Sequence, residues 1–372
     1  MNKQQKHFRV LMTTDTVGVV WRYSLRLAEA LEKYNMEIHL VTMGPLPDEE
    51  QRKEAAALNN VQVYESSYKL EWQDEPWDEI EQANMWLLHL EQQIKPHLVH
   101  LNNYVFGELP WDSPVLIVGH SCVLSWWENV KKESLPSYWE TYRQKVGLGL
   151  HAADTVVSVS GMMKRQLDTH YGPLKNIEVI YNGIPTTEDN PVKKEDQIFA
   201  MGRSWDESKN QQILAKAADR LPFPVIVAGE GLDPDANGGN NLKKLGKLTR
   251  MQVSEILTHS RIFVSPSLYE PFGLAALEAA DRGCVLVLSD IDTYHEIWQD
   301  AAVYFDPRDA ESLIKVIYDL EKQPALMRSL REKAKSRSRD FDISSQASQY
   351  ANIYQRMIQK QGQKTTDSSY SH

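Results

Sequence analysis

The sequence predicts an α/β protein made of two doubly wound, Rossmann-like domains, and three observations support this prediction. Short apolar strands alternate with longer helical patterns along the chain, which is typical of right-handed βαβ units and a parallel sheet. The length of 372 residues suits two domains of ordinary size. A polar, proline-containing stretch at 185–196 separates two such series. We expect the two domains to face each other across a ligand-binding cleft.

The first domain is predicted to span residues 1–185 and to begin with the apolar strand VLMTT at 10–14. Apolar residues then recur at helical spacing from Trp21 to Lys33, which predicts a helix. The turn signal Asn182-Gly183 closes the series. Between these landmarks we expect strands at 38–43, 98–101, 115–120, 155–160 and 178–184, and helices at 80–94, 137–151 and 162–170.

The second domain is predicted to span residues 186–345 and to repeat the alternation. Its strands are expected at 197–202, 224–231, 261–267 and 285–290, and its helices at 209–220, 249–259, 273–282, 310–322 and 325–338. A last helical pattern covers 346–360, with Tyr350 and Tyr354 among its apolar positions. Residues 361–372 are polar, and we expect them to form a flexible tail.

The charge balance excludes one broad class of function. The formal net charge is -10, whereas non-specific nucleic-acid binding needs a basic surface. We therefore expect no nucleic-acid partner. A local basic cluster leaves weak peripheral association with a membrane open; its members are Lys131, Lys132, Arg143 and Lys145.

The cysteines and the apolar runs bear on the compartment. Cys122 and Cys284 each lie in or beside an apolar run, so we expect two small buried hydrophobic residues, without a disulfide framework or zinc site. The N-terminus has no apolar signal core, and no apolar run has the length of a membrane-spanning helix. The expected location is the cytoplasm, with the inner face of a membrane left open.

The stretch from Leu268 to Glu278 carries the chemistry. It joins a predicted strand to a predicted helix and places Glu270 before the helix and Glu278 within it. Pro271 biases the preceding residue away from helical backbone angles, and Gly273 allows a close approach of backbone. The first amides of the helix have no partner within it and lie at the positive end of its dipole. They therefore favour an anion such as a phosphate.

Two carboxylates on either side of a bound phosphate suit a ligand with hydroxyls on both sides of a pyrophosphate. A nucleotide sugar has this form, with a ribose on one side and a hexose on the other. Glu278 would lie about 7 Å along the helix axis from the phosphate end. From the spacing alone, a surface loop charge at Glu270 and a solvated helix residue at Glu278 explain the pattern equally well.

The segment SLYEPFGLAALEAADRGCVLVLSD at 267–290 resembles the Glu-x7-Glu signature of family-four retaining glycosyltransferases, the group 1 glycosyltransferases, which have the GT-B architecture. The resemblance implies that Glu270 contacts hydroxyls of the donor sugar and that Glu278 binds the ribose hydroxyls. It further implies that the helix at 346–360 crosses back to the first domain. The residues it assigns to the diphosphate or sugar are Phe272, Gly273 and Leu274.

The loop Met201–Asn210 is similar to the family's Gly-Arg…Lys-Gly loop. The resemblance implies that Arg203 and Lys209 neutralise the diphosphate. Fixed cations there would lower the barrier, because the leaving nucleoside diphosphate gains charge as the glycosidic bond breaks. Asn210 stands where the family often has glycine, a departure that would shift the loop while keeping both cations. Leu248 resembles part of the family's base-reading segment, although a plain turn explains it equally well.

The first domain contains four further candidate site residues. Gly18 lies at the first strand–helix turn, where the family has a glycine pair, but Val19 takes the second place and would alter the approach of the acceptor. His120, at the carboxyl end of a strand, matches a family histidine near the reacting sugar. Asn102 and Asn103 are similarly placed after another strand and are candidates for the acceptor side.

A metal-dependent mechanism is the main chemical rival. The Asp-x-Asp triplet of the other large glycosyltransferase architecture binds a divalent metal, and it occurs here at 233–235, 290–292 and 340–342. Because Arg203 and Lys209 would already neutralise the diphosphate, we expect no essential metal and no cofactor. The triplet at 290–292, which follows a strand, remains the rival. The sequence contains no complete P-loop, and no dinucleotide fingerprint follows the first strand.

Together these observations predict a retaining hexosyltransferase that moves a hexose, glucose first, from a nucleotide-diphosphate sugar to a saccharide or lipid-linked saccharide. A UDP-sugar is expected ahead of a GDP-sugar. A non-redox epimerase of the same architecture and a non-catalytic nucleotide-sugar-binding protein stay open, as does the oligomeric state. No protein nucleophile is evident, and the catalytic candidates are His120, Arg203, Lys209 and Glu270.

Overall fold

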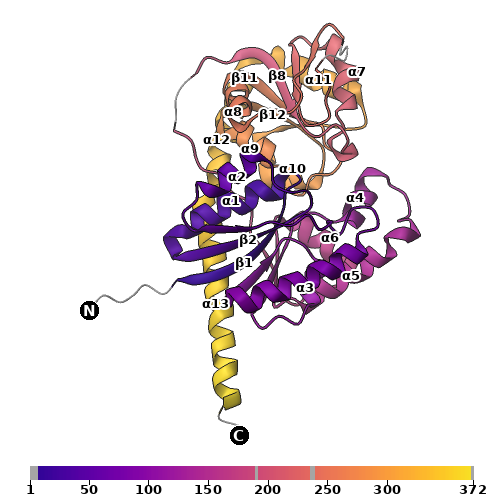
Figure 1. Cartoon of the computed structure of the whole chain (residues 1–372). Coiled ribbons are helices and arrows are strands. Elements are labelled where there is room, and N and C mark those ends of the chain that lie inside the picture. The colour runs from indigo at the N-terminus through magenta and orange to yellow at the C-terminus, as the bar shows by residue number, and fades with distance from the viewer. Residues whose placement is uncertain (1–6, 189–191, 235–238, 370–372) are drawn as a thin grey trace. The chain divides into compact units, whose positions relative to one another are not determined.

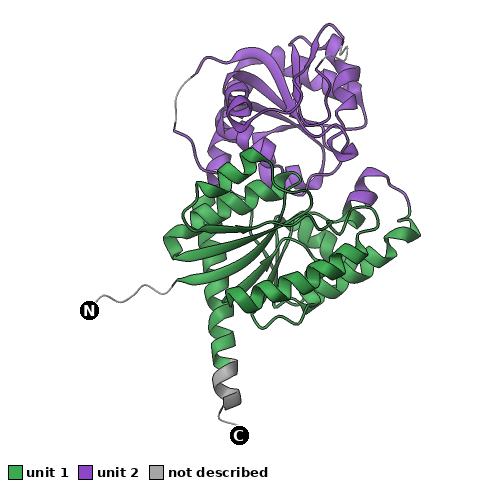
Figure 2. Ribbon diagram, viewed as in Figure 1, with its two compact units in different colours: residues 1–125, 134–182, 343–372 green, residues 126–133, 183–342 purple. Residues whose placement is uncertain are grey.

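The computed structural model describes residues 7–188, 192–234 and 239–369 and divides into two compact units (Figures 1 and 2). Unit 1 comprises residues 1–125, 134–182 and 343–372, and unit 2 comprises residues 126–133 and 183–342. The main division therefore falls at residues 182/183, close to the predicted linker. The short segment 126–133, which we had expected in the first domain, groups with unit 2.

Unit 1 is built on a seven-stranded parallel sheet with the order β3-β2-β1-β4-β5-β6-β7. Strands β4 and β5 are buried along their whole length and are apolar except for His100, as expected of a parallel sheet that is covered on both faces. The strand order reverses between β1 and β4, where sheets of this type bind ligands. The strands are β1 Phe8–Asp15, β2 Met36–Met43, β3 Val61–Tyr64, β4 Leu98–Leu101, β5 Val115–Gly119, β6 Thr155–Ser158 and β7 Ile177–Val179.

The last helix of the chain, α13 (Ile343–Ser369), belongs to unit 1, where it packs against α1 and β4. Tyr350 and Tyr354 are completely buried there. The predicted end at 360 is too early: the helix continues to Ser369, and only 370–372 of the predicted tail lie outside the described residues. The other helices that begin in unit 1 are α1 Val19–Leu31, α2 Glu49–Ala56, α3 Trp77–Ile94, α4 Val123–Val130, α5 Glu140–Ala152 and α6 Gly161–Tyr171.

Unit 2 contains a six-stranded parallel sheet with the order β10-β9-β8-β11-β12-β13, which reverses between β8 and β11. The strands are β8 Glu195–Met201, β9 Val225–Ala228, β10 Leu242–Lys244, β11 Ser260–Ser265, β12 Val285–Ser289 and β13 Val303–Phe305. The helices are α7 Gln212–Ala217, α8 Arg250–His259, α9 Leu274–Asp281, α10 Asp292–Trp298, α11 Ala310–Glu321 and α12 Pro324–Ser338.

Both cysteines are buried and free, as expected. Within the described part of the chain, none of the helices combines the length and apolar character needed to cross a bilayer. The helix predicted at 209–220 is shorter than expected, because 3-10 turns at Glu207–Lys209 and Ala218–Arg220 flank α7.

A tight backbone contact in unit 1 gives a direct test of this fold. A Cβ atom at Gly149 of α5 would lie 1.9 Å from the carbonyl oxygen of Tyr104. Because backbone cannot yield as a side chain can, we expect Gly149→Ala to lower the free energy of unfolding by about 3 kcal/mol. Urea denaturation followed by circular dichroism measures the change.

Gly147, on the same helix, is the matched control. A Cβ atom there would lie 3.6 Å from the Tyr171 ring, an ordinary contact. Gly147→Ala should raise the free energy of unfolding by about 0.5–1 kcal/mol, because alanine favours helix more than glycine does. Equal effects of the two substitutions would contradict the packing of α5.

Candidate functional site

The start of α9 in unit 2 has the geometry of an anion-binding site. Gly273 precedes the helix with φ 96° and ψ 51°, and a Cβ atom there would lie 2.8 Å from Cε1 of Tyr294. Glycine is therefore required both by its backbone conformation and by the neighbouring ring. This glycine is the N-cap residue of α9, so the cap itself has no side chain that could bond the first amides of the helix. These donors, at the positive end of the helix dipole, suit a phosphate.

Lys209 and Glu270 form an ion pair beside this helix start. Lys209 follows β8 and Glu270 follows β11, so both lie where the strand order of unit 2 reverses. The distance from Nζ to Oε2 is 2.7 Å, and the two side chains are 20% and 16% exposed. The structure thus pairs Lys209, which is predicted to bind the diphosphate, directly with Glu270, which is predicted to bind the sugar. Gly202 makes room for this lysine, because a Cβ atom there would lie 2.9 Å from that of Lys209.

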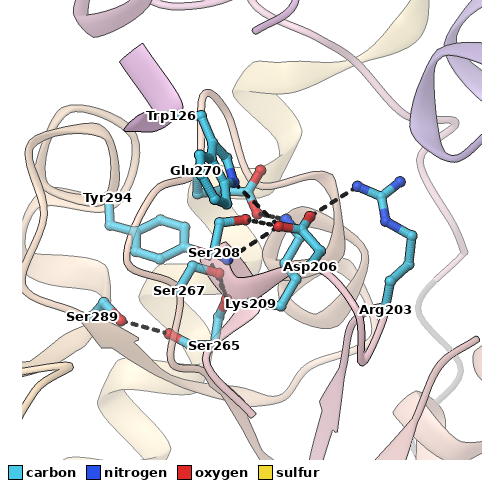
Figure 3. A network of polar contacts seen from close by, with 10 residues as sticks. All are labelled: Trp126, Arg203, Asp206, Ser208, Lys209, Ser265, Ser267, Glu270, Ser289 and Tyr294. Atoms are coloured by element: carbon cyan, nitrogen blue, oxygen red, sulfur yellow. Dashed lines mark hydrogen bonds and ion pairs between the residues drawn. The ribbon is translucent and has the colours of Figure 1, made fainter. Parts of the chain in front are cut away.

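Arg203 is held by a carboxylate that the sequence did not single out, that of Asp206. The Arg203 Nη2 atom lies 2.9 Å from Oδ2 of Asp206. Oδ1 accepts hydrogen bonds from the amide and the hydroxyl of Ser208, at 3.1 and 2.6 Å, and from Nε1 of Trp126 at 3.4 Å. Figure 3 shows this network around Asp206. The guanidinium of Arg203 also lies 4.6 Å above the exposed ring of Trp205.

Asp206 remains ionised in this network. Burial alone would raise the pKa of its carboxyl, but the charge of Lys209, the Ser208 hydrogen bond and Arg203 together outweigh burial and lower the pKa. The predicted cations are thus placed by two carboxylates, Asp206 and Glu270. The sequence offers a local hint for Asp206, which caps the 3-10 turn after Arg203, whereas nothing local connects Trp126 to this loop.

Asn210 explains how the loop tolerates its departure from the family's glycine. Its backbone is left-handed, with φ 47° and ψ 37°, a conformation that glycine adopts freely and asparagine more readily than most residues. Its Nδ2 donates to the carbonyl oxygens of Pro266 and Pro307 at 3.0 and 2.7 Å. The left-handed backbone that a glycine would provide is therefore present, and the expected shift of the loop is not required.

The remaining candidates of unit 2 differ in their surroundings. Glu278 is half-buried on α9, and Leu274 is half-buried at its first turn. The Phe272 side chain packs edge-on against Phe341 with the ring centres 5.8 Å apart, so its ring belongs to the core. Leu248 is half-buried after β10. Gly246, just before it, accepts a hydrogen bond from the Gly229 amide at 2.8 Å.

His120 and Asn102 come together in unit 1. They follow the neighbouring strands β5 and β4, and the distance from His120 Nε2 to Asn102 Oδ1 is 2.7 Å. The His120 ring lies edge-on to that of Tyr23 with the ring centres 4.4 Å apart. His120 itself retains some exposed surface, yet the dense surroundings of the ring, and next the His100 ring, lower its pKa to about 3.

The other candidate site residues of unit 1 have surroundings that differ from those of this pair. Asn103 is buried, and its side chain interacts with Glu71, a carboxyl whose pKa burial raises to about 7. Gly18 precedes α1 with φ 97° and ψ -133°, a conformation suited to glycine. Val19 then begins α1 and is 50% exposed.

The aspartates of the predicted metal triplets have other partners. Asp290 Oδ1 lies 2.6 Å from Nε2 of His295, Asp340 pairs with Arg337 at 2.9 Å, and Asp342 accepts a hydrogen bond from Thr186 at 3.0 Å. Asp235 lies outside the described residues. No group of three or more potential metal ligands occurs within the described ranges.

Two family models match the chain in succession. Residues 20–188 match the model described as glycosyltransferase family 4, and residues 185–337 match the model described as glycosyl transferases group 1. The chain is 30% identical over 223 residues to a glycogen synthase of Mycobacterium tuberculosis, a match that covers 54% of each protein. It is 24% identical over 185 residues to the O-antigen chain mannosyltransferase RfbU of Salmonella typhimurium, which covers 45% of this chain and 51% of RfbU. The chain thus spans about half the length of the curated relatives it matches.

Solved structures confirm the predicted fold. Sucrose-phosphate synthase from Thermosynechococcus elongatus matches with a TM-score of 0.81 at 17% identity, over 95% of this chain and 100% of that one. HepE of Anabaena, in complex with UDP-glucose, matches with a TM-score of 0.74 at 16% identity, over 94% of this chain and 100% of that one. At these identities the likeness shows the fold alone, which is the GT-B fold with two parallel sheets.

Asn210 provides a test of the loop geometry. Asn210→Ala loses two hydrogen bonds and keeps a strained left-handed backbone, so we expect the free energy of unfolding to fall by about 3 kcal/mol. Asn210→Gly loses only the hydrogen bonds and should be more stable than the alanine variant by about 1 kcal/mol. Chemical denaturation of both variants measures the difference. An alanine variant as stable as the glycine variant would rule out the left-handed conformation.

Proposed function

Two family models that together match residues 20–337 indicate a group 1 glycosyltransferase, and on that premise we propose a retaining hexosyltransferase that uses UDP-glucose. The observation that carries the proposal is the glycine-capped start of α9, which lies between Glu270 and Glu278 and beside the cation Lys209. A helix start, a cation and two carboxylates suit the diphosphate and the hydroxyls of a nucleotide sugar.

Arg203 and Lys209 would stabilise the diphosphate as it leaves. Each cation is already held by a carboxylate at hydrogen-bonding distance, so little reorganisation is needed when negative charge develops on the leaving group. Lys209 can share its remaining donors between Glu270 and a phosphate oxygen. Glu270, an acceptor held in place by that lysine, would receive hydrogen bonds from the donor sugar, and Glu278 would receive those of the ribose.

His120 would act as a neutral group near the reacting sugar. Because burial lowers its pKa to about 3, the imidazole carries no charge near neutral pH and is unsuited to the role of general acid. We propose reaction on one face of the sugar without a protein nucleophile, with the leaving phosphate helping to deprotonate the acceptor. Arg203 and Lys209 would supply positive charge at the diphosphate without a metal ion, which supports a metal-independent reaction.

The substrates follow from the comparisons as proposals. UDP-glucose comes first, because the structure of HepE contains it. A GDP-sugar comes second, since RfbU is named a mannosyltransferase. The proposed acceptor is a saccharide or a lipid-linked saccharide in polysaccharide or glycoconjugate synthesis. We propose that the reaction takes place in the cytoplasm, at the inner face of a membrane if the acceptor is lipid-linked.

An activity screen tests the proposed function. The full chain is incubated with UDP-glucose or GDP-mannose, with and without saccharide acceptors, in the presence of EDTA. We expect release of nucleoside diphosphate that depends on acceptor, and an NMR spectrum of the product with the anomeric configuration of the donor. An epimerised nucleotide sugar formed without acceptor, or binding of donors without any release, would overturn the proposal.

Substitutions of Glu278 and Glu270 should have different effects on the affinities for UDP and UDP-glucose. Glu278→Ala is expected to weaken binding of both UDP and UDP-glucose by about 10- to 100-fold, the effect of losing hydrogen bonds to a charged group. Glu270→Gln should leave the affinity for UDP close to that of the wild type while lowering the affinity for UDP-glucose and the turnover. Isothermal titration calorimetry with both ligands measures these affinities.

The exposed Glu321 of α11 provides the control for these two variants. Glu321→Ala removes the same negative charge from a residue far in sequence from Glu270 and Glu278. This variant should bind both ligands with wild-type affinity. If Glu278→Ala also keeps wild-type affinity for UDP and UDP-glucose, the assignment of Glu278 to the ribose is wrong.

A further inference from the structure

A chain of hydrogen bonds in unit 1 connects the C-terminal helix to His120. Tyr354 of α13 places its hydroxyl 2.5 Å from Nδ1 of His100, a fully buried residue of β4. Nε2 of His100 lies 3.4 Å from Oδ1 of Asn102. The same Oδ1 atom lies 2.7 Å from Nε2 of His120. Four side chains from α13, β4 and the ends of β4 and β5 are thus linked in one series.

The orientation of the Asn102 amide is fixed by its other partner. Its Nδ2 lies 2.6 Å from the carbonyl oxygen of Thr13, an atom that can only accept a hydrogen bond. The nitrogen of the amide must therefore point to Thr13, and its oxygen must point to the histidines. The backbone amide of Asn102 also donates to Oγ1 of Thr13 at 2.9 Å, which holds the residue in place.

This orientation determines which ring nitrogens carry protons. Because an amide oxygen can only accept, Nε2 of His120 must be the protonated nitrogen, and Nδ1 of the neutral ring then keeps its lone pair. The same argument places the proton of His100 on Nε2, so that its Nδ1 accepts from Tyr354. The series begins at the hydroxyl of Tyr354 and ends at the carbonyl oxygen of Thr13. Each polar atom in it acts only as a donor or only as an acceptor.

The surroundings of His120 keep the ring neutral. Tyr23 lies edge-on to it from α1, and His100 of β4 shares the Asn102 oxygen with it. Tyr350 and Tyr354 extend the aromatic cluster from α13. Burial raises the pKa of all three tyrosines, and it lowers that of His100 to about 3. None of these neighbours supplies a negative charge that would stabilise an imidazolium.

We propose that Asn102 is a positioning residue: its amide, anchored on Thr13, fixes His120 as a ring protonated on Nε2 that offers the Nδ1 lone pair to a sugar hydroxyl. Tyr354 completes the series by bonding Nδ1 of His100. The contact with the sugar rests on the proposed function, whereas the fixed protonation of the ring does not.

Nitrogen-15 NMR of the ring nitrogens tests the series in the full-length protein without any substrate. Spectra of His120→Gln and His100→Gln variants assign the two rings. We expect both rings of the wild type to show one protonated and one unprotonated nitrogen, with the proton on Nε2. A proton on Nδ1 of His120, or a rapidly exchanging mixture, would overturn the proposal.

Tyr354→Phe and its control extend the test. The variant leaves Nδ1 of His100 without a donor, so we expect the chemical shift of that nitrogen to change, whereas His120 keeps its proton on Nε2 because Thr13 still anchors Asn102. Tyr350→Phe removes another buried hydroxyl of α13, which bonds to neither histidine, and should leave both spectra unchanged.

Asn102→Ala removes the amide oxygen that accepts from both rings. Without that acceptor we expect His120 to lose its fixed protonation and to show a rapidly exchanging mixture of the two neutral ring forms. An unchanged His120 spectrum in Asn102→Ala would overturn the proposal. A protein with the expected spectra but no transferase activity would instead overturn the proposed function and leave the series intact.

Discussion

The burial of both parallel sheets is the constraint on which the other features depend. Strands that are covered on both faces must be apolar along most of their length, so polar side chains gather where the strands end. Lys209 and Glu270 follow β8 and β11, and Asn102 and His120 follow β4 and β5. In each sheet these positions lie at or beside the reversal of strand order, so the same constraint that builds the core also places the chemistry.

The two units meet this constraint with different electrostatics. Unit 2 keeps charges near the start of α9, and each cation has a carboxylate at 2.7 or 2.9 Å. Such pairing offsets part of the cost of partial burial while leaving donors free for an anion. Unit 1 instead gathers neutral imidazole, amide and phenol groups. His100 lies inside a fully buried strand, where an unsatisfied ring nitrogen would be costly, and Tyr354 removes that cost.

Most of the architecture could be predicted from local sequence patterns, because strands such as LVHL at 98–101 are short apolar runs between clear breaks. Three strands had no such pattern: β3, β10 and β13 are the short outer strands of their sheets, and β10 reads LKK. Glu270 and Glu278 could be singled out because a proline, a glycine and a helix surround them. Tyr354 could not be linked to the site, since its contact with His100 joins residues 254 positions apart.

The place of α13 in the chain has a consequence for biogenesis. A ribosome completes every strand of unit 1 and the whole of unit 2 before it synthesises Tyr350 and Tyr354. Until then His100 lacks its phenol partner and the face of β4 and α1 that α13 covers remains exposed. The first unit therefore cannot reach its final structure before α13 has been synthesised, although domains commonly fold from the N-terminus onward. Synthesis of α13 is the step at which His100 first acquires its phenol partner.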